Sequence, residues 1–391
     1  MQNKTLATLL LSVFIALLGI GIIVPVMPVF ASELGAGGLA LGMIIAAFSV
    51  TRGLLQPVVG NLSDRVGRKN FLIAGLFIYG LVGLLIPHAG SVSNLIVIRS
   101  FHGVGSAMIV PIAMAYMSLL APTGYEGRYM SYLNVAIFCG IGCGPVIGGF
   151  LSDLWGMPAV FYSMALLSFF AFVLVIFYMP EHHGGEQRRE DSLLQSLVSM
   201  LKNSKTCGIF LARYATMIIM VPTMAFLPLL MFRWEGSSGL QIGIVIGCRT
   251  LVNAVLQIPF GKIADTCNKL TVLLTSSVLL ALILLIIPFV NSFPVMAFTY
   301  FLLGCVEAAI WAVLGAYASL EAKAHYGHGT MMGVFALAMS GGVFTGALLA
   351  GFSMDGWGIE RAYYVTGGTV FVLSVVAAMM IGRYEARSTP P

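Results

Sequence analysis

The chain has 391 residues, of which 59% are hydrophobic and 9% are charged, and its mean hydropathy is +0.97. Soluble domains carry about 25% charged residues, so this composition excludes a soluble protein and indicates an integral membrane protein. The formal net charge of +5 invites a nucleic-acid partner, but the positions of the basic residues argue against one.

Twelve apolar segments follow one another along the chain, and each is long enough to cross the ~30 Å hydrocarbon core of a bilayer as a helix. The first follows a single basic residue, Lys4, and no small-residue cleavage site comes after it. It is therefore predicted to be a retained span rather than a signal peptide. The predicted spans are 6–30, 38–60, 70–88, 93–118, 128–151, 157–179, 207–232, 240–262, 270–289, 293–318, 329–352 and 361–382.

The basic residues outside the spans are distributed unequally. If both termini are cytoplasmic, only Arg233 and Arg361 lie on the outer side, and fourteen lie on the inner side. This positive-inside pattern supports an even number of spans and cytoplasmic termini, and it accounts for the net charge without a nucleic-acid partner. A bacterial cytoplasmic membrane is the most economical setting for a chain with such short loops. The inner residues are Lys4, Arg65, Arg68, Lys69, Arg128, Arg188, Arg189, Lys202, Lys205, Lys262, Lys269, Lys323, Arg383 and Arg387.

A highly charged stretch, GNLSDRVGRKN over 60–70, connects the second and third spans. Gly60 would allow two helices to approach, and Asp64 could accept hydrogen bonds from helix N-terminal amides or a guanidinium. Arg65 could pair with an acid of a neighbouring part of the chain. We therefore predict a charged gate that holds one face of the protein shut; the alternative is that these charges only fix the topology.

The two halves of the sequence resemble each other. With a shift of 201 residues, QPVVGNLSD over 56–64 lies on QIPFGKIAD over 257–265, and Gly103 lies on Gly304. With a shift of 202, GFLSDLWG from Gly149 lies on GFSMDGWG from Gly351. The repeat gives the predicted gate a second copy at Asp265.

The repeat and the spans together predict an all-α membrane protein with twelve transmembrane helices in two pseudo-symmetric six-helix bundles. The predicted bundles cover 1–180 and 206–391, and a polar cytoplasmic linker covers 181–205. Repeats of this kind place the binding site of a transporter between the two halves.

The fifth span contains a glycine-rich motif, GIGCGPVIGG over 140–149. Gly144 and Pro145 thin the helix and remove a backbone hydrogen bond, which predicts a kink that flexes or seals against a neighbour. Close packing of the same glycines explains the motif as well.

Five ionisable residues lie deep in the predicted spans, where each costs roughly 2.5–3.5 kcal/mol on insertion scales. Glu307, about twelve residues from either end of its span, is the only acid among them. A carboxyl near the bilayer midplane can bind and release a proton as its surroundings change, so Glu307 is our proton-coupling candidate. The alternative is a static ion pair with Arg249 or another arginine. The five residues are Arg52, Arg99, Arg213, Arg249 and Glu307.

The remaining deep residues suggest a substrate site. Arg52 and Arg249 are expected to face a central cavity, whereas Arg213 lies near the inner end of its span and is expected to snorkel toward water. Aromatic residues are plausible walls of a tolerant apolar pocket, above all Trp311, one turn after Glu307. The predicted substrate-binding residues are Arg52, Arg249, Trp311, Tyr116 and Tyr317.

The sequence lacks the features of an enzyme. It has no phosphate-cradling loop, no metal-binding His and Glu spacing and no large soluble domain, and its six cysteines lack zinc-like spacing. We predict neither catalytic residues nor a metal site.

The charged loop over 60–70, its copy over 261–265 and the two-half organisation closely resemble the major facilitator superfamily, over the whole chain. Within it, GIGIIVPVMPVF over 19–30 and the motif over 140–149 resemble the twelve-helix drug:proton antiporters. The resemblance implies a monomeric multidrug exporter that alternates access and uses the proton gradient without a cofactor. Arg99 stands where proton-coupled members carry the arginine of their proton-transfer motif, so the resemblance assigns it to proton coupling.

The charges qualify the cargo that the resemblance implies. Drug exporters of this family often carry an acid in the first span, and this first span has none. Four deep arginines against one glutamate favour an anionic or zwitterionic substrate over a cation. Two functions stay open: an antiporter that exports small amphipathic compounds, and a symporter or uniporter that imports an organic anion bound at Arg52 or Arg249.

Overall fold

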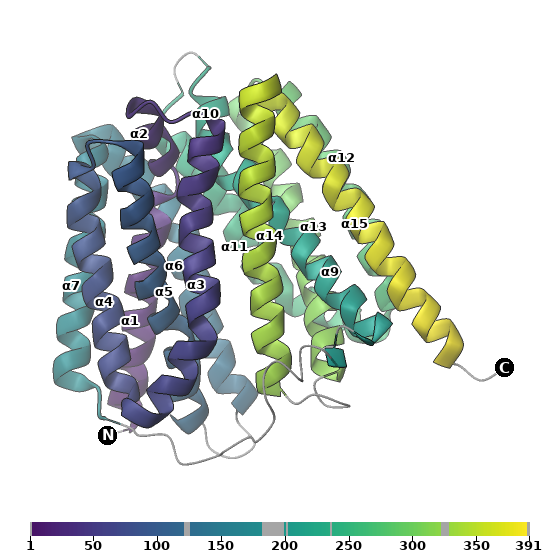
Figure 1. Cartoon of the computed structure of the whole chain (residues 1–391), viewed down its shortest axis with the longest axis horizontal. Helices are drawn as coiled ribbons and strands as arrows, with labels where there is room; N and C mark the ends of the chain where they lie inside the picture. The colour runs from purple at the N-terminus through teal and green to yellow at the C-terminus, as the bar shows by residue number, and fades with distance from the viewer. Residues whose placement is uncertain are drawn as a thin grey trace.

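The computed structural model describes residues 2–120, 126–181, 199–200, 202–234, 237–321 and 328–388, and this part of the chain contains helices and no strand. Twelve helices in the described residues are long and apolar enough to cross a membrane, which confirms the predicted fold class (Figure 1). The α-helices are α1 Gln2–Ile23, α2 Met27–Glu33, α3 Gly38–Val66, α4 Arg68–Leu85, α5 Val92–Leu120, α6 Glu126–Trp155, α7 Met157–Tyr178, α9 Ser204–Ile218, α10 Leu227–Met231, α11 Gly239–Thr266, α12 Lys269–Ile286, α13 Phe293–Glu321, α14 His328–Trp357 and α15 Ile359–Ser388.

The predicted first span, 6–30, is interrupted in the structure. Helix α1 ends at Ile23, and the short helix α2 begins at Met27, after Pro25. Proline has no backbone N–H to continue the helical ladder, so the chain turns here instead of extending α1. Helix α2 lies with α10 at the end of the molecule opposite both termini (Figure 1).

The seventh span is not a uniform α-helix. Between α9 and α10, residues Val221–Phe226 form a π-helical segment, η2, with Pro222 near its start. Proline removes a backbone donor, and π-helical turns are rare and concentrate at functional sites. This segment supplies a residue to the site described below.

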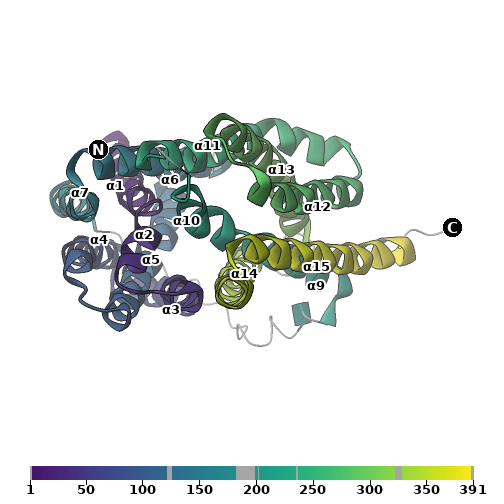
Figure 2. The same ribbon diagram turned by 90° about the horizontal axis from the view of Figure 1, so that it is seen from above.

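The helices gather in two groups, α1–α7 and α9–α15, which lie side by side when the molecule is seen from above (Figure 2). Equivalent glycines hold equivalent helix pairs together in each group. A Cβ on Gly103 of α5 would lie 2.6 Å from the Phe48 carbonyl oxygen of α3, and one on Gly304 of α13 would lie 2.5 Å from the Arg249 carbonyl oxygen of α11. All four residues obey the shift of 201 found in the sequence. The predicted linker, 181–205, lies largely outside the described residues, so the domain boundaries stay a prediction.

Two seams join the groups, one between α3 and α14 and one between α6 and α11. Glycines bring the backbones together in both. A Cβ on Gly42 would lie 2.3 Å from the Ala347 carbonyl oxygen, and one on Gly149 would lie 2.0 Å from the Gly239 carbonyl oxygen. Any side chain at these positions would therefore push the groups apart.

At one end of each seam, an aspartate from one group caps a helix of the other. Asp153, on α6, accepts hydrogen bonds from the backbone N–H groups of Gly239 and Leu240 at the start of α11, at 2.8 and 2.9 Å. Asp355, on α14, accepts in the same way from Gly38 and Leu39 at the start of α3. We call this end of the molecule, defined by the two aspartates and the two helix starts, the clasped face.

The opposite ends of α3 and α11 are not packed in this way. At Gly60 and Gly261, one repeat apart, no described atom of another segment lies within 4 Å of the position that a Cβ would occupy. The described residues therefore show no close helix approach at Gly60, and its role in the gate stays a prediction. The side chains of Asp64, Arg65 and Asp265 lie outside the described part of the chain, so the charged gate stays a prediction.

Candidate functional site

A buried ion pair lies at the centre of the C-terminal group. The Arg249 guanidinium of α11 holds the Glu307 carboxylate of α13 with two hydrogen bonds, from Nε to Oε2 at 2.7 Å and from Nη2 to Oε1. Arg249 is 1% exposed and Glu307 is 4% exposed. This two-pronged geometry is the strong form of a charge-assisted hydrogen bond. The structure thus joins the proton-coupling candidate to one of the predicted substrate-binding arginines.

The π-helical segment completes this pair. Arg249 Nη1 donates to the Thr223 hydroxyl at 2.6 Å, and the Tyr300 hydroxyl donates to the Thr223 carbonyl at 2.9 Å. Arg249 therefore directs each of its three nitrogens to an acceptor on α13 or on the seventh span. An anion could replace Glu307 on Arg249 only by breaking this arrangement.

Arg213 points into the C-terminal group and does not snorkel, contrary to the expectation from sequence. Its guanidinium carbon lies 4.2 Å from the ring centre of Trp311 and 4.9 Å from that of Phe335, and the residue is 5% exposed. Nη2 contacts the Met339 sulfur at 3.1 Å. The aromatic rings, rather than water at the membrane surface, surround this charge, so Arg213 belongs with the site.

Trp311 lies where the two helix groups meet. Its ring centre is 6.3 Å from that of Phe138 on α6, and it is partly exposed. Gly315, four residues further along α13, has open space where a side chain would stand. This placement fits the predicted role of Trp311 in lining a cavity between the halves, a role that stays a prediction.

Arg99 lies in the N-terminal group, in a cluster of its own. Its Nη1 donates to His102 Nδ1 at 2.7 Å, and its guanidinium carbon lies 4.5 Å from the Phe48 ring centre. Tyr79 covers the other side of His102, with ring centres 4.6 Å apart. The structure brings Arg99 together with His102 and not with Glu307.

Arg52 is half-buried on α3, one turn after Phe48. Among the described residues, no carboxylate oxygen lies within 4.0 Å of Arg52, Arg99 or Arg213. Three of the four deep arginines thus have no acidic partner there.

The two predicted tyrosines lie away from the ion pair. Tyr116 is fully buried, and its hydroxyl donates to the Pro180 carbonyl at the end of α7, at 3.1 Å. Tyr317 is 2% exposed, and Lys205 lies 5.7 Å from its ring centre. Lys205 in turn pairs with Glu321 at 3.0 Å. Both tyrosines pack near helix ends. Tyr116 belongs to α5 in the other helix group, and Tyr317 follows Glu307 on α13 by more than two turns.

The motif over 140–149 packs helix α6 closely against two neighbouring helices. Gly144 packs on α1, where a Cβ would lie 2.5 Å from Gly21, and the Pro145 carbonyl oxygen would lie 2.1 Å from a Cβ on Gly243 of α11. The motif therefore forms part of a seam between the groups. The contact fits both of the alternatives that the sequence leaves open, a seal and close packing, so the gating role of Gly144 and Pro145 stays a prediction.

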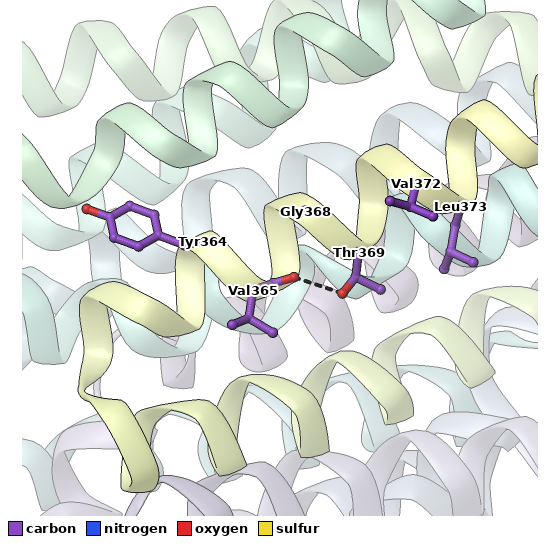
Figure 3. Close-up of a pocket in the computed structure, with 6 residues that line it drawn as sticks. All are labelled: Tyr364, Val365, Gly368, Thr369, Val372 and Leu373. Atoms are coloured by element: carbon purple, nitrogen blue, oxygen red, sulfur yellow. Dashed lines mark hydrogen bonds between the residues drawn. The ribbon is translucent and has the colours of Figure 1, made fainter.

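A shallow hollow on α15 is the pocket drawn in Figure 3. Tyr364, Val365, Gly368, Thr369, Val372 and Leu373 line it. The Thr369 hydroxyl donates a hydrogen bond to the Val365 carbonyl at 2.8 Å. The hollow carries no charged group, so we do not assign it to the site.

Sequence reasoning assigned no role to Thr223, Asp153 and Asp355, and it left Arg213 outside the site. The repeated aspartate of GFLSDLWG and GFSMDGWG was a visible signal for Asp153 and Asp355. Pro222 signalled an irregular helix next to Thr223. Nothing in the local sequence gives the direction in which Arg213 points.

Comparison with known proteins gives a consistent picture. The family model described as Major Facilitator Superfamily matches residues 9–235 and 206–391. An uncharacterized MFS-type transporter of Methanocaldococcus jannaschii is 29% identical, over 97% of this chain and 99% of its own. Multidrug resistance protein 2 of Bacillus subtilis is 30% identical, over 68% of this chain and 69% of its own. The crystal structure of the nucleoside transporter NupG shares the fold, with a TM-score of 0.80 at 12% identity, and the match covers 96% of this chain and 99% of that one.

Proposed function

Because this chain belongs to the major facilitator superfamily and is a multi-pass membrane transporter rather than an enzyme, we propose that it exports small amphipathic compounds in exchange for protons. The observation that carries this proposal is the buried Arg249–Glu307 pair. The other buried carboxylate of the described chain, Glu321, is the last residue of α13 and pairs with Lys205. Glu307 is thus the described acid best placed to couple proton movement to a change between the halves.

The proposed coupling follows from the geometry of the pair. A proton on Glu307 removes the negative charge to which Arg249 makes two hydrogen bonds. Arg249 then keeps Thr223 as its strong acceptor, and the bond between α11 and α13 weakens. In this proposal, substrate bound between the halves and the proton on Glu307 exclude each other, as exchange requires. Arg99, in the other helix group, acts in this proposal only through the packing between the groups.

The clasped face can be assigned to one side of the membrane in this proposal. With both termini cytoplasmic, as the basic residues predict, the clasped face would be external, and the ends of α3 and α11 at Gly60 and Gly261 would lie on the cytoplasmic side. The proposed cycle opens the external seams and closes the ends of α3 and α11 around Gly60, Asp64, Arg65 and Asp265. We propose that a monomer in a bacterial cytoplasmic membrane carries this out.

The name of the Bacillus subtilis relative, a multidrug resistance protein, supports drug-like cargo. A second candidate, import of an organic anion, is favoured by the three arginines without a carboxylate partner in the described chain. Arg52 is available to such an anion, whereas Glu307 and Thr223 already engage Arg249.

The first test is proton release from purified protein when a drug is added, measured with a pH-sensitive dye in weakly buffered detergent solution. Wild-type protein is expected to release protons on binding an amphipathic drug, and Glu307→Gln is expected to release none. Glu321→Gln, on the same helix, is the matched control and should behave as wild type.

Glu307→Gln leaves Arg249 charged and unpaired, which threatens folding. The double variant Arg249→Gln/Glu307→Gln avoids this and should also release no protons. Undiminished release from either variant would rule out coupling at Glu307. Absence of release from wild type, together with binding of an anion that disappears on replacement of Arg52, would favour the second candidate.

A further inference from the structure

Two contacting side chains of the site each carry a buried hydrogen-bond donor without an acceptor among the described residues. Arg213 Nε and Trp311 Nε1 are both buried atoms with no hydrogen-bond partner in the described structure. Buried donors are nearly always satisfied, and an ionised one without a partner is costly. We propose that this pair binds the anionic group of the transported compound, a carboxylate or a group of similar shape. The inference rests on the proposed transport of small amphipathic compounds.

The stacking of Arg213 leaves its edge as the binding surface. The guanidinium is planar and packs against the Trp311 and Phe335 rings, at 4.2 and 4.9 Å. Stacking of this kind uses the face of the guanidinium and leaves its N–H groups free for a bidentate acceptor. The acceptor that Arg213 has, the Met339 sulfur, is a weak one.

Glu307 does not neutralise Arg213. The carboxylate lies one turn before Trp311 on α13, but Arg249 engages both of its oxygens. The cluster therefore holds two guanidinium groups and one carboxylate, and one positive charge stays without a counterion among the described residues. An anion bound at Arg213 would balance the cluster.

Trp311 lies where the helix groups meet, so a ligand bound between the groups would approach this pair from that side. Phe138 of the N-terminal group lies against Trp311, and there is open space beside Gly315. The rings of Trp311, Phe335 and Phe138 would hold the apolar part of the compound. The Arg99 cluster lacks such access, because His102 is fully buried between Phe48 and Tyr79.

The test compares the binding of 4-phenylbutyrate and the uncharged 4-phenylbutanol to purified protein by titration calorimetry. Arg213→Gln is expected to weaken phenylbutyrate binding about tenfold or more, as the loss of hydrogen bonds to a charged group predicts. Trp311→Phe keeps the ring and removes the donor, so a smaller loss, about threefold to tenfold, is expected. Phenylbutanol has no anionic group, so both changes should weaken its binding far less than they weaken phenylbutyrate binding. Arg233→Gln and Trp357→Phe, on exposed residues, are the matched controls.

Equal phenylbutyrate affinity in wild type and Arg213→Gln would overturn the inference. Retained phenylbutanol binding shows that a variant is folded. Arg213→Lys keeps the charge but not the planar edge, so its affinity for phenylbutyrate should lie between those of wild type and Arg213→Gln. The protein is also purified with phosphatidylglycerol or with phosphatidylcholine alone. Retention of phosphatidylglycerol that depends on Arg213, without phenylbutyrate binding, would assign the donors to a lipid headgroup and overturn the cargo assignment. Proton release and phenylbutyrate binding are measured separately. A failure of proton coupling at Glu307 therefore leaves the Arg213 site standing, and a failure of the Arg213 site leaves the coupling standing.

Discussion

In the N-terminal group, Gly103 of α5 packs on the backbone of Phe48 in α3; in the C-terminal group, Gly304 of α13 packs on the backbone of Arg249 in α11. The backbones cross in the same way at positions 201 residues apart, but the side chains differ. Ser106 stands where the C-terminal group has Glu307, and Tyr300 stands where the N-terminal group has Arg99. The repeat therefore specifies helix packing, while each group has its own charges.

The buried arginines of the two groups also have different partners. The C-terminal group pairs Arg249 with a carboxylate, whereas Arg99 in the N-terminal group has a histidine and an aromatic ring. A paired buried charge becomes costly when its partner is removed, and an unpaired one does not lose a counterion. The groups should therefore respond unequally to similar substitutions.

The largest effect is expected at the ion pair. Glu307→Gln leaves Arg249 buried and uncompensated, which should lower the free energy of unfolding by about 3–5 kcal/mol. The double variant Arg249→Gln/Glu307→Gln should recover most of this loss. Thermal unfolding in detergent, followed by size-exclusion chromatography of heated samples, measures both. A single variant as stable as wild type would mean that the pair contributes nothing to folding.

The glycine crossings should give a smaller, equal effect. Gly103→Ala and Gly304→Ala each force a methyl group against a carbonyl oxygen and should cost about 1–3 kcal/mol. Only Gly304→Ala moves the Arg249 backbone, so only this variant should also impair proton release. Gly368→Ala, on α15 where space is open, is the control and should lose no stability. Clearly unequal costs at the two crossings would contradict the equivalence of the helix pairs.

Replacing Arg99 should cost less than breaking the ion pair. Arg99→Met removes a hydrogen bond to His102 and a cation–π contact, together worth about 1–2 kcal/mol, but it leaves no carboxylate unpaired. The same thermal measurement, made beside Glu307→Gln, compares the groups directly. A loss of stability as large as that of Glu307→Gln would show that Arg99 has a charged partner in the N-terminal cluster.

The smallest effects are expected at the clasped face. Asp153→Asn and Asp355→Asn each weaken the capping of an exposed helix start, worth about 0.3–1 kcal/mol, and should do so equally. Spin labels on Leu39→Cys and Phe352→Cys, with the native cysteines replaced, report the separation of α3 from α14. Each Asn variant should enlarge the fraction of molecules with widely separated labels, and the double variant should enlarge it further. An unchanged distance distribution would remove any role of the caps in holding the face closed.

The fold and the ion pair were largely predictable from sequence. Apolar length marks the spans, and a lone acid near the bilayer midplane marks Glu307, for which Arg249 was one of the partners considered. The direction of Arg213 was not predictable, because it depends on how α9 is rotated against α13 and α14. The role of Thr223 depends on a π-helical turn that Pro222 only suggests. Asp153 and Asp355 repeat visibly, but their role requires knowing which helix starts lie opposite them.

The caps at Asp153 and Asp355 are exposed to solvent, unlike the ion pair in the interior. Charges at a protein surface are screened by dissolved ions over about 10 Å at 0.1 M ionic strength and over about 3 Å at 1 M. Rising salt on that side of the membrane should therefore loosen both caps together and leave the Arg249–Glu307 pair nearly unaffected. Salinity on one side of the membrane becomes a means of shifting the conformational equilibrium without touching the coupling residues.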